Sequence, residues 1–463
     1  MNWTNKFRAY VAERHDEHVR ELMRYVAQPS VSSTGEGMPD AAIYAAGLAR
    51  RCGLDARLVA GISGHPAVLA QADGPPGTPH VLIYGHYDVQ PPGPLQSWAS
   101  PPFAPEVRDG RVYGRGTGDN KGQHLAHLLA LRMLSELCGA MPCRVSVLLD
   151  GEEEIGSPHL PEIIDRCARD LAPDLVIVSD GPVLEDGSAV VKLGVRGVLT
   201  FELRARGARS PLHSGNWGGV APNPAWRLVW LLATLRAPDG RLLIPGFAAG
   251  IKPLTAGEHA AVDELPVDPP TVLAEIGASA FDVPTDVGYF ERLTGPTLSI
   301  NSLTCEDDDK HRTVIPHVAI ARCDARLADG QRSESVAAAI AAHVQRVAPD
   351  IEFVPAGHAI EPCRTLPESA YTGTIRDAIA AVLGGRVYVK PAMGGSLPLH
   401  VLADRLGTPC YGVPFANADE ANHAPDENLQ LSRFHDAIRV SASILQELAA
   451  HHRRTTAPEP SQR

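Results

Sequence analysis

Five residues of the types that bind divalent cations follow runs that read as buried strands or as strand-to-loop junctions, in widely separated parts of the chain. Carboxylates and imidazoles at such positions are suited to holding two cations close together, an arrangement used for hydrolysis. The residue types therefore predict a two-metal hydrolase site. Its candidate ligands are His86, Asp119, Glu154, Asp180 and His423.

Three short runs of aliphatic and β-branched residues have the composition of strands that are covered on both faces. In open α/β sheets, ligands bind outside the carboxyl ends of the strands. Polar residues follow each of these runs at once, so we expect three of the candidate ligands, His86, Glu154 and Asp180, to converge on one crevice. The runs are residues 81–84, 145–149 and 175–178.

His86 and Glu154 each have neighbouring residues that support a role in a metal site. A single histidine after a strand is more often a packed residue than a ligand. Asp88, however, lies two residues after His86, where it could hold the second imidazole nitrogen and fix the tautomer. The acidic run 152–154 directly follows an apolar strand, so we expect it in the crevice rather than on an outer surface. Adjacent carboxylates there supply a ligand and a neighbouring base.

The glycine-rich segment 114–122 has two other interpretations. It opens a helix, as phosphate-binding loops do, but it lacks the G-x-x-x-x-G-K-[ST] spacing and the preceding strand of a dinucleotide site. Asp119 is also compatible with a simple helix N-cap. Its alternative use is as a carboxylate that bridges two metals.

Length and composition exclude several classes of protein. A chain of 463 residues exceeds what one hydrophobic core usually supports, so we expect two domains. A composition of 44% apolar and 21% charged residues is typical of a soluble globular protein. The formal net charge of −12 argues against a nucleic-acid partner, because proteins that bind phosphate backbones carry clustered Lys and Arg.

The sequence also predicts a location away from membranes. The N-terminal stretch 1–31 lacks the apolar core of a signal peptide, and no run approaches the roughly 20 apolar residues of a membrane span. The eight cysteines show no C-x-x-C pair and no framework spacing. We therefore expect reduced thiols in a cytoplasmic protein.

The order of the elements predicts an interrupted α/β fold. Up to Lys192, strand-like runs alternate with helical patterns, which is typical of a mixed, largely parallel, doubly wound sheet. The middle of the chain reads strand, helix, strands, helix, strand, as in an α+β unit of the ferredoxin-like type. One of its helices is signalled by Asn223 as cap and Pro224 in the first turn. We therefore expect a catalytic domain in two parts, 1–193 and 363–463, around an inserted domain, 194–362.

Nine short motifs occur in order at residues 85–89, 114–122, 152–157, 179–180, 213–215, 313–316, 326–327, 394–396 and 422–427. Among them are Gly-His-Tyr-Asp-Val at the first position and Asn-His-Ala-Pro-Asp-Glu at the last. Together they resemble the co-catalytic zinc metallopeptidase family. That family includes carnosinase and related cytosolic dipeptidases, carboxypeptidase G, aminoacylase, acetylornithine deacetylase and succinyl-diaminopimelate desuccinylase.

The resemblance implies a di-metal catalytic domain that is split by a lid domain, through which members of the family form homodimers. Asp119 would bridge two divalent cations. His86 and Asp180 would complete one site, and Glu154 and His423 the other. Mixed imidazole and carboxylate ligands suit zinc, with manganese or cobalt as substitutes.

The resemblance also assigns roles in catalysis. Asp88 would orient His86, and Glu153 would be the general acid and base. Two cations lower the pKa of a shared water towards neutrality, so Glu153 would take its proton during attack on an amide and pass it to the departing amine. His213, on the lid, would reach the site of a neighbouring subunit and stabilise the oxyanion.

A further set of residues would bind the substrate. Arg326 matches the arginine that grips a substrate carboxylate, for which a guanidinium fork is suited. The alternative for Arg326 is a salt bridge on the lid surface. The other residues implied in this pocket are Gly395, Ser396 and Asn301.

The motifs are most similar to the dipeptidase branch, because residues 239–247 resemble the lid of that branch. We therefore expect cleavage of dipeptides or related small amides that carry a free carboxylate. That branch places Arg-Glu before the Gly-Gly-Ser, whereas this chain has Ala392-Met393, which favours an N-acyl-amino-acid amidohydrolase as the alternative. The acidic run 306–309 is either a solvated loop or a recognition element for a basic group. An inactive binding protein is the remote alternative, because all five ligands and Glu153 are present.

Overall fold

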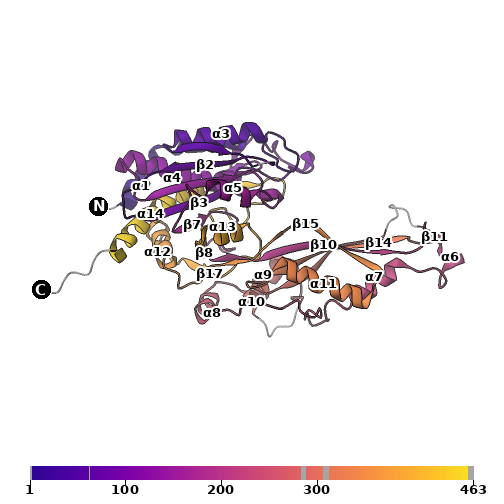
Figure 1. The fold of residues 1–463 in the computed structure, drawn as a ribbon. Helices are drawn as coiled ribbons and strands as arrows, with labels where there is room; N and C mark the ends of the chain where they lie inside the picture. Colours follow the sequence, from indigo (N-terminus) through magenta and orange to yellow (C-terminus); the bar gives the residue numbers. More distant parts are fainter. Residues whose placement is uncertain (1–2, 62, 283–287, 306–311, 457–463) are drawn as a thin grey trace.

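The two largest β-sheets of the described chain are separate from each other (Figure 1). The computed structural model describes residues 3–61, 63–282, 288–305 and 312–456, so the acidic run 306–309 lies outside the described residues. An eight-stranded sheet carries the larger part of the chain, and a four-stranded antiparallel sheet carries the lid. This confirms the predicted α/β fold with an α+β unit inserted into it.

The large sheet is mixed and largely parallel, as predicted. Its order is β1-β2-β6-β3-β7-β18-β8-β17. Neighbours from β6 to β18 are parallel, as are β8 and β17, whereas β1, β2 and the β18–β8 step are antiparallel. The strands are β1 (Asp55–Val59), β2 (Ala67–Ala72), β3 (His80–His86), β6 (Arg144–Asp150), β7 (Leu175–Val178), β8 (Val190–Lys192), β17 (Tyr388–Lys390) and β18 (Cys410–Gly412).

Helices cover both faces of the large sheet, which explains why its central strands are apolar throughout. Along β3, Val81 and Ile83 enter one core, whereas Leu82 and Tyr84 enter the other. The first core lies beneath α1 (Trp3–Glu13), α2 (His15–Val26), α3 (Met38–Arg51), α4 (Gly122–Cys138), α12 (Thr372–Leu383) and α14 (Leu431–Thr456). The second lies beneath α5 (Leu160–Cys167) and α13 (Leu399–Leu406).

The lid has the β-α-β-β-α-β order of a ferredoxin-like unit. Its strands are arranged β12-β14-β10-β15, and Leu203, Leu228 and Ile340 share a core between the sheet and its two helices. Asn223 caps the first helix as predicted, since its Oδ1 accepts from the N–H of Ala225 at 3.0 Å. The elements are β10 (Gly197–Arg206), α7 (Pro224–Leu232), β12 (Thr297–Cys305), β14 (Val318–Leu327), α11 (Ser333–Val347) and β15 (Ile351–Ile360).

Shorter elements complete the two parts. Between α7 and β12, the described residues form three helices, namely α8 (Ala256–Asp263), α9 (Pro269–Glu275) and α10 (Tyr289–Thr294). At the outer end of the lid, β11 (Leu212–His213) pairs with β13 (Val314–Ile315) and leads into α6 (Ser214–Trp217) (Figure 1). A three-stranded sheet contains β4 (Glu106–Arg108), β5 (Arg111–Tyr113) and β19 (Asn428–Gln430), and the turn η1 (Leu95–Ser97) precedes it.

The boundaries between the two parts, 193/194 and 362/363, stay a proposal. Two short strands, β9 (Gly194–Val195) and β16 (Cys363–Arg364), lie at these positions and pair with each other. Among the described helices, none is long and apolar enough to cross a membrane. The eight cysteines are all unpaired.

A buried histidine in the N-terminal helices predicts acid sensitivity. His18 on α2 is fully buried, and its ring lies 6.0 Å from that of His435 on α14. Neither of its ring nitrogens has a hydrogen-bond partner among the described residues. Burial, reinforced by the charge of Arg132, lowers the pKa of His18 to about 3. Protonation of this ring is therefore strongly disfavoured in the folded state.

We expect His18→Phe to reduce the loss of stability in acid. Between the unfolded pKa of about 6.5 and the folded pKa of His18, the unfolded chain binds one more proton at this ring, so stability falls as the pH falls. When the pH falls from 7 to 5, the His18→Phe protein should therefore lose about 2 kcal/mol less of its unfolding free energy than the wild-type protein. Urea unfolding of both proteins at the two pH values measures this, and equal losses would contradict it.

Candidate metal centre

The carboxyl ends of three neighbouring parallel strands form the floor of the candidate site. His86 is the last residue of β3, which lies between β6 and β7. Asp180 follows β7, and Glu154 lies in a short turn, η3 (Glu153–Ile155), that follows β6. Because these strands are parallel neighbours, their following residues meet at one edge of the sheet.

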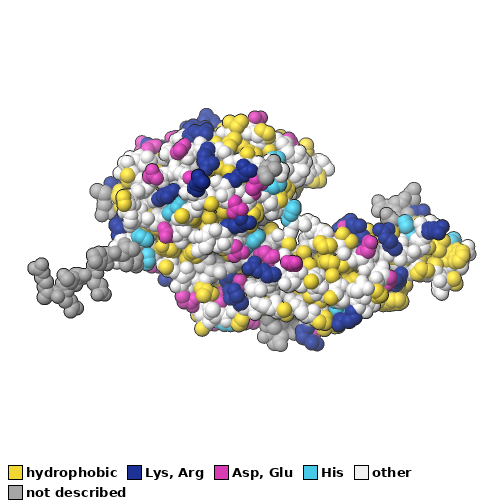
Figure 2. All heavy atoms as spheres, viewed as in Figure 1, with side chains coloured by type: hydrophobic (Ala, Val, Ile, Leu, Met, Phe, Trp, Pro, Cys, Tyr) yellow, Lys and Arg dark blue, Asp and Glu magenta, His cyan; other side chains and the backbone are white. Residues whose placement is uncertain are grey.

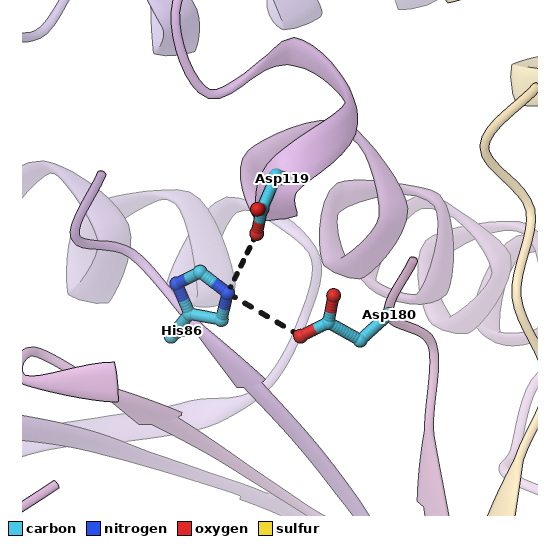
Figure 3. Close-up of side chains that lie close together, drawn as sticks. All are labelled: His86, Asp119 and Asp180. Atoms are coloured by element: carbon cyan, nitrogen blue, oxygen red, sulfur yellow. Dashed lines mark ion pairs between the residues drawn. The ribbon is translucent and has the colours of Figure 1, made fainter. Parts of the chain in front are cut away.

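The first cluster joins His86, Asp119 and Asp180 (Figure 3). The Nε2 atom of His86 lies 3.1 Å from Oδ1 of Asp119 and 3.4 Å from Oδ2 of Asp180. All three residues are buried, and the imidazole points between the two carboxylates (Figure 3).

The second cluster joins Asp119, Glu154 and His423. The Nε2 atom of His423 lies 3.0 Å from Oδ2 of Asp119 and 3.2 Å from Oε2 of Glu154. The two carboxylate oxygens of Asp119 therefore face different imidazoles, which is the arrangement required of a bridging ligand. The side chain of His423 is 53% exposed, so this cluster lies on the open side of the site. The structure thus brings all five predicted ligands together, and their binding of metal stays a prediction.

The charges in the two clusters are unbalanced. Burial opposes ionisation of Asp119, yet His423 and His86 hold the pKa of this carboxyl well below its usual value. Burial alone would lower the pKa of His86, but Asp119, Asp180 and Asp88 raise it well above the usual value. Asp119 and Glu154 raise the pKa of His423 to about 10. Burial and then Asp119 raise the pKa of Glu154 to about 7. The buried carboxylates therefore strongly favour positive charge at the two imidazoles.

Divalent cations fit this arrangement. The Nδ1 atom of His86 lies 3.1 Å from the backbone oxygen of Asp88, so a neutral ring that donates there presents a lone pair on Nε2. Within the described chain, that buried Nε2 has no hydrogen-bond partner, although two carboxylates face it. The ligand atoms of each cluster lie within 4.8 Å of one another. Imidazole and carboxylate donors at such spacing suit zinc.

Asp88 is predicted to hold the imidazole of His86, and its closer contact with that ring is made by its backbone and not by its carboxylate. Its backbone oxygen holds the His86 ring, while the nearer carboxylate oxygen is 3.4 Å from that ring. The Asp88 carboxylate instead accepts from the backbone N–H of Glu153 at 3.2 Å and of Glu154 at 3.0 Å. Asp88 therefore links the candidate ligand of one strand to the acidic turn of its neighbour.

The glycine-rich segment is neither a phosphate loop nor a helix cap. Asp119 lies in a wide helical turn, η2 (Thr117–Lys121), with non-helical φ and ψ of −121° and 90°, and the peptide bond after it is cis. The segment's N–H groups at Gly116, Gly118 and Asp119 each donate to the Glu427 carboxylate at 3.0 Å. A buried side chain of the protein thus occupies the place of an anionic ligand.

Sequence reasoning assigned no role to Glu427. This carboxylate is fully buried and also accepts from Nη1 of Arg115 at 2.6 Å, although burial raises the pKa of Glu427. A buried acid requires partners. The sequence did contain one signal for this residue, because Glu427 lies four residues after His423 in the motif at 422–427 that resembles the peptidase family. Glu427 joins the loop of one candidate ligand to the loop of another.

The predicted substrate residues form a separate group. Nη1 of Arg326, at the end of β14, donates to Oγ of Ser396 at 3.0 Å, and its Nε lies 3.4 Å from Oδ2 of Asp324. Gly395 is exposed beside Ser396. This contact crosses from the lid to the larger part, and Figure 2 shows a hollow between the two parts.

Two predicted residues lie apart from both clusters in this chain. His213 is exposed at the outer end of the lid, far from β3 and β7 in Figure 1. Its Nδ1 accepts from the N–H of Gly215 at 3.1 Å. Asn301 is exposed on the edge strand β12. Neither residue belongs to a candidate ligand cluster among the described residues.

Comparison with known proteins adds an independent finding. The sequence model of Peptidase family M20/M25/M40 matches residues 82–447. The chain is 29% identical to the Cys-Gly metallodipeptidase dug1 of Schizosaccharomyces pombe over 399 residues, which is 83% of each protein. It is 26% identical to the Beta-Ala-His dipeptidase of Rattus norvegicus over 400 residues, 84% of this chain and 80% of the relative.

The fold is also similar to a solved structure. The M20 family metallo-carboxypeptidase Sso-CP2 from Sulfolobus solfataricus superposes with a TM-score of 0.87 at 29% identity. The similarity covers 94% of this chain and 99% of that one. Both sheets are therefore part of the shared architecture.

Proposed function

Because the chain belongs to peptidase family M20/M25/M40, we propose that it is a metal-dependent dipeptidase. It would hydrolyse the amide bond of dipeptides, or of related small amides that carry a free carboxylate. The observation that carries this proposal is the pair of clusters that share Asp119, with Glu153 next to the ligand Glu154. The named activities of the relatives, which act on Cys-Gly and Beta-Ala-His, support a dipeptide as substrate.

Two divalent cations would occupy the clusters. Asp119 would contact both, with His86 and Asp180 on one side and Glu154 and His423 on the other. Zinc suits these donors, and manganese or cobalt are the substitutes. When bound, such ions polarise an amide carbonyl and make water acidic enough to lose a proton near neutral pH.

Glu153 is the proton carrier in this proposal. Its backbone N–H is held by Asp88, which keeps it beside Glu154. Burial, together with the charges of Asp180 and Glu154, holds the pKa of Glu153 well above the usual carboxyl range. A carboxylate in such surroundings takes a proton from the attacking water and gives it to the amide nitrogen, which leaves poorly unless protonated.

Arg326 would bind the carboxylate of the substrate. A guanidinium binds a carboxylate through two parallel N–H groups, which sets orientation as well as charge. Because Arg326 on the lid already donates to Ser396 on the larger part, a substrate carboxylate there would lie between the two parts. The exposed backbone of Gly395 would face the same pocket, and Asn301 stays a further candidate for it.

The proposal includes a homodimer in which His213 acts across the interface. Three of the five tryptophans are exposed on α6 and α7, and the rings of Trp226 and Trp230 stack at 6.2 Å. Figure 2 shows hydrophobic side chains gathered over these helices at the outer end of the lid. An apolar patch of this kind is typical of a protein interface. The exposed position of His213 beside this patch supports a role at a second subunit's site.

We expect His213→Ala to lower kcat by at least about 10²-fold, as the loss of an oxyanion donor does. The defect should be complemented between subunits. His213→Ala and Glu153→Gln, co-expressed with different tags, should regain activity in the purified heterodimer, because one site then combines an intact Glu153 with His213 of the partner subunit. Steady-state kinetics of the doubly tagged fraction measures this.

Trp230→Asp serves as the control for the interface, because a buried charge opposes association. It should shift the protein to monomer in light scattering and remove complementation. A fully active monomer, or a heterodimer as inactive as its parents, would refute the role of His213 across subunits.

An N-acyl-amino-acid amidohydrolase is the second candidate. Ala392-Met393 replaces the Arg-Glu of the dipeptidase branch, and Met393 packs against the core beneath α5 and α13. This position therefore offers no acidic group to a substrate amine. Both candidates use the same ions and the same base. The unpaired cysteines support a reducing, cytoplasmic location for either.

A substrate panel tests the proposal. The purified protein, reconstituted with zinc or manganese, is assayed by mass spectrometry on dipeptides, β-alanyl dipeptides and N-acetyl or N-succinyl amino acids. We expect cleavage of the free-amine dipeptides. Cleavage confined to N-acyl substrates would move the assignment to the amidohydrolase, and no cleavage with any metal would favour a binding protein.

A further inference from the structure

One buried side chain links the three segments that carry the first cluster, because it lies on one of them and contacts the other two. Asn120 is fully buried and directly follows Asp119. Its Oδ1 accepts from the backbone N–H of His86 at 3.4 Å, and its Nδ2 donates to the backbone oxygen of Ser179 at 2.6 Å. Ser179 directly precedes Asp180. The amide of Asn120 thus joins the ends of β3 and β7 to the turn η2.

A second pair of residues sets the orientation of this amide. The ring of His124, one helical turn after Asn120, has its Nδ1 3.1 Å from the same Oδ1. Its Nε2 lies 2.9 Å from the hydroxyl of Tyr25 on α2. Burial lowers the pKa of His124 well below its usual value, so the ring is neutral. A neutral ring that donates from Nδ1 to Asn120 accepts on Nε2 from Tyr25.

The packing around this network leaves little freedom. A Cβ atom at Gly85, next to His86, would lie 2.9 Å from Oδ1 of Asn120 and 2.9 Å from Cβ of His124. Tyr25 and His124 also form an edge-to-face ring contact at 5.3 Å. The positions of the amide, the imidazole and the phenol are therefore mutually fixed.

We propose that Asn120 is a positioning residue that sets the geometry of the first cluster, and that His124 and Tyr25 fix the orientation of its amide. The network contacts the backbone beside His86 and Asp180 and is adjacent to Asp119. In the described part of the chain, none of its hydrogen bonds reaches Glu154 or His423. It therefore holds His86 and Asp180, the two ligands that belong to the first cluster alone, so its effect should fall mainly on that metal position. The inference rests on the proposed two-metal site.

The N-terminal helix α2 gains a functional role from this network. Tyr25 precedes the region, residues 82–447, that the family model matches. Residues that hold metal ligands in place affect metal affinity by about 10–100-fold in known sites. We expect the effect of Asn120 to fall in this range and that of the single Tyr25 hydroxyl to be smaller.

Titration of metal-free protein with Co²⁺ tests the inference, because the visible absorption of cobalt reports on each binding step separately. Wild-type protein should bind two ions. Asn120→Leu keeps the side-chain volume but removes both polar atoms, and it should weaken one step about 10–100-fold while the other changes little. Tyr25→Phe should weaken the same step by a smaller factor and alter its spectrum.

Two matched variants control for loss of buried hydrogen bonds elsewhere. Gln331→Leu removes a buried amide in the lid that accepts from Ala328 N–H at 2.8 Å and donates to Phe247 O at 2.5 Å. Tyr411→Phe removes a buried hydroxyl that lies 2.6 Å from Oγ of Ser369. Both should leave the two cobalt steps unchanged.

The outcomes separate this inference from the proposed function. A wild-type protein that binds fewer than two ions overturns the two-metal site itself. Two normal steps in both Asn120→Leu and Tyr25→Phe would overturn the positioning role while the proposed function stands. Equal weakening of both steps would show that the network acts on the whole site and would also refute it. If Asn120→Leu does not fold, Tyr25→Phe alone decides between these results.

Discussion

Replacing Glu153 by glutamine is expected to lower turnover by about 10³-fold while the protein keeps both metal ions. Glutamine has the size of glutamate but cannot take a proton from water or return it to the leaving amine. Glu153 belongs to neither cluster of candidate ligands, so metal binding should survive. Kinetic assays on the best dipeptide, with metal analysis of the same sample, measure both quantities.

The two neighbouring glutamates provide the controls. Glu152 is occupied, because Oε2 lies 2.7 Å from Nδ1 of His159 and Oε1 accepts from the N–H of His65 at 3.0 Å. Glu152→Gln should therefore leave catalysis largely intact. Glu154→Gln should lower metal content as well as rate. Substantial hydrolysis by Glu153→Gln, or a larger loss with Glu152→Gln, would show that the wrong carboxylate had been assigned as the base.

Asp119→Ala should have the second large effect, since among the described residues Asp119 is the one candidate ligand common to both clusters. Its oxygens face both His86 and His423, so both ions lose a negative donor at once. We expect metal content to fall from two ions towards none. The loss of activity should exceed the roughly 10–100-fold effect of removing a residue that only holds a metal ligand in place. Metal analysis after gel filtration and the dipeptide assay measure these effects.

His423→Ala is the matched control for Asp119. This histidine contributes to the second cluster alone, so its removal should cost one ion and leave the ion between His86 and Asp180. A protein with Asp119→Ala that still holds two ions would contradict the bridging role. So would loss of both ions in His423→Ala.

Much of the fold could be predicted because it depends on local patterns. The apolar runs of β3, β6 and β7 have the composition of strands buried on both faces, and the structure places alternate residues in two cores. The lid helix α11, which spans Ser333–Val347, is the second helix of the predicted order strand, helix, strands, helix, strand. Hydrophobic periodicity indicates which face of a helix or strand is buried. Such an element can therefore be predicted without knowing which other elements pack against it.

The convergence of the candidate ligands was predictable for a related reason. Parallel neighbours end at the same edge of a sheet, so residues that follow them must meet there. His86, Glu154 and Asp180 follow this rule. Asp119 and His423 do not directly follow strands of the large sheet, so this rule does not predict their convergence with the other three ligands.

The sequence by itself therefore determined the fold class, the residue types of the site and the edge of the sheet on which it lies. Only the tertiary structure decided that Glu427 fills the glycine-rich loop, that the backbone of Asp88 holds His86, and that Asn120 reaches Tyr25 through His124. It also placed His213 at the far end of the lid (Figure 1). The physical reason is that a buried polar group must find a partner, but which partner it finds depends on packing between segments distant in sequence.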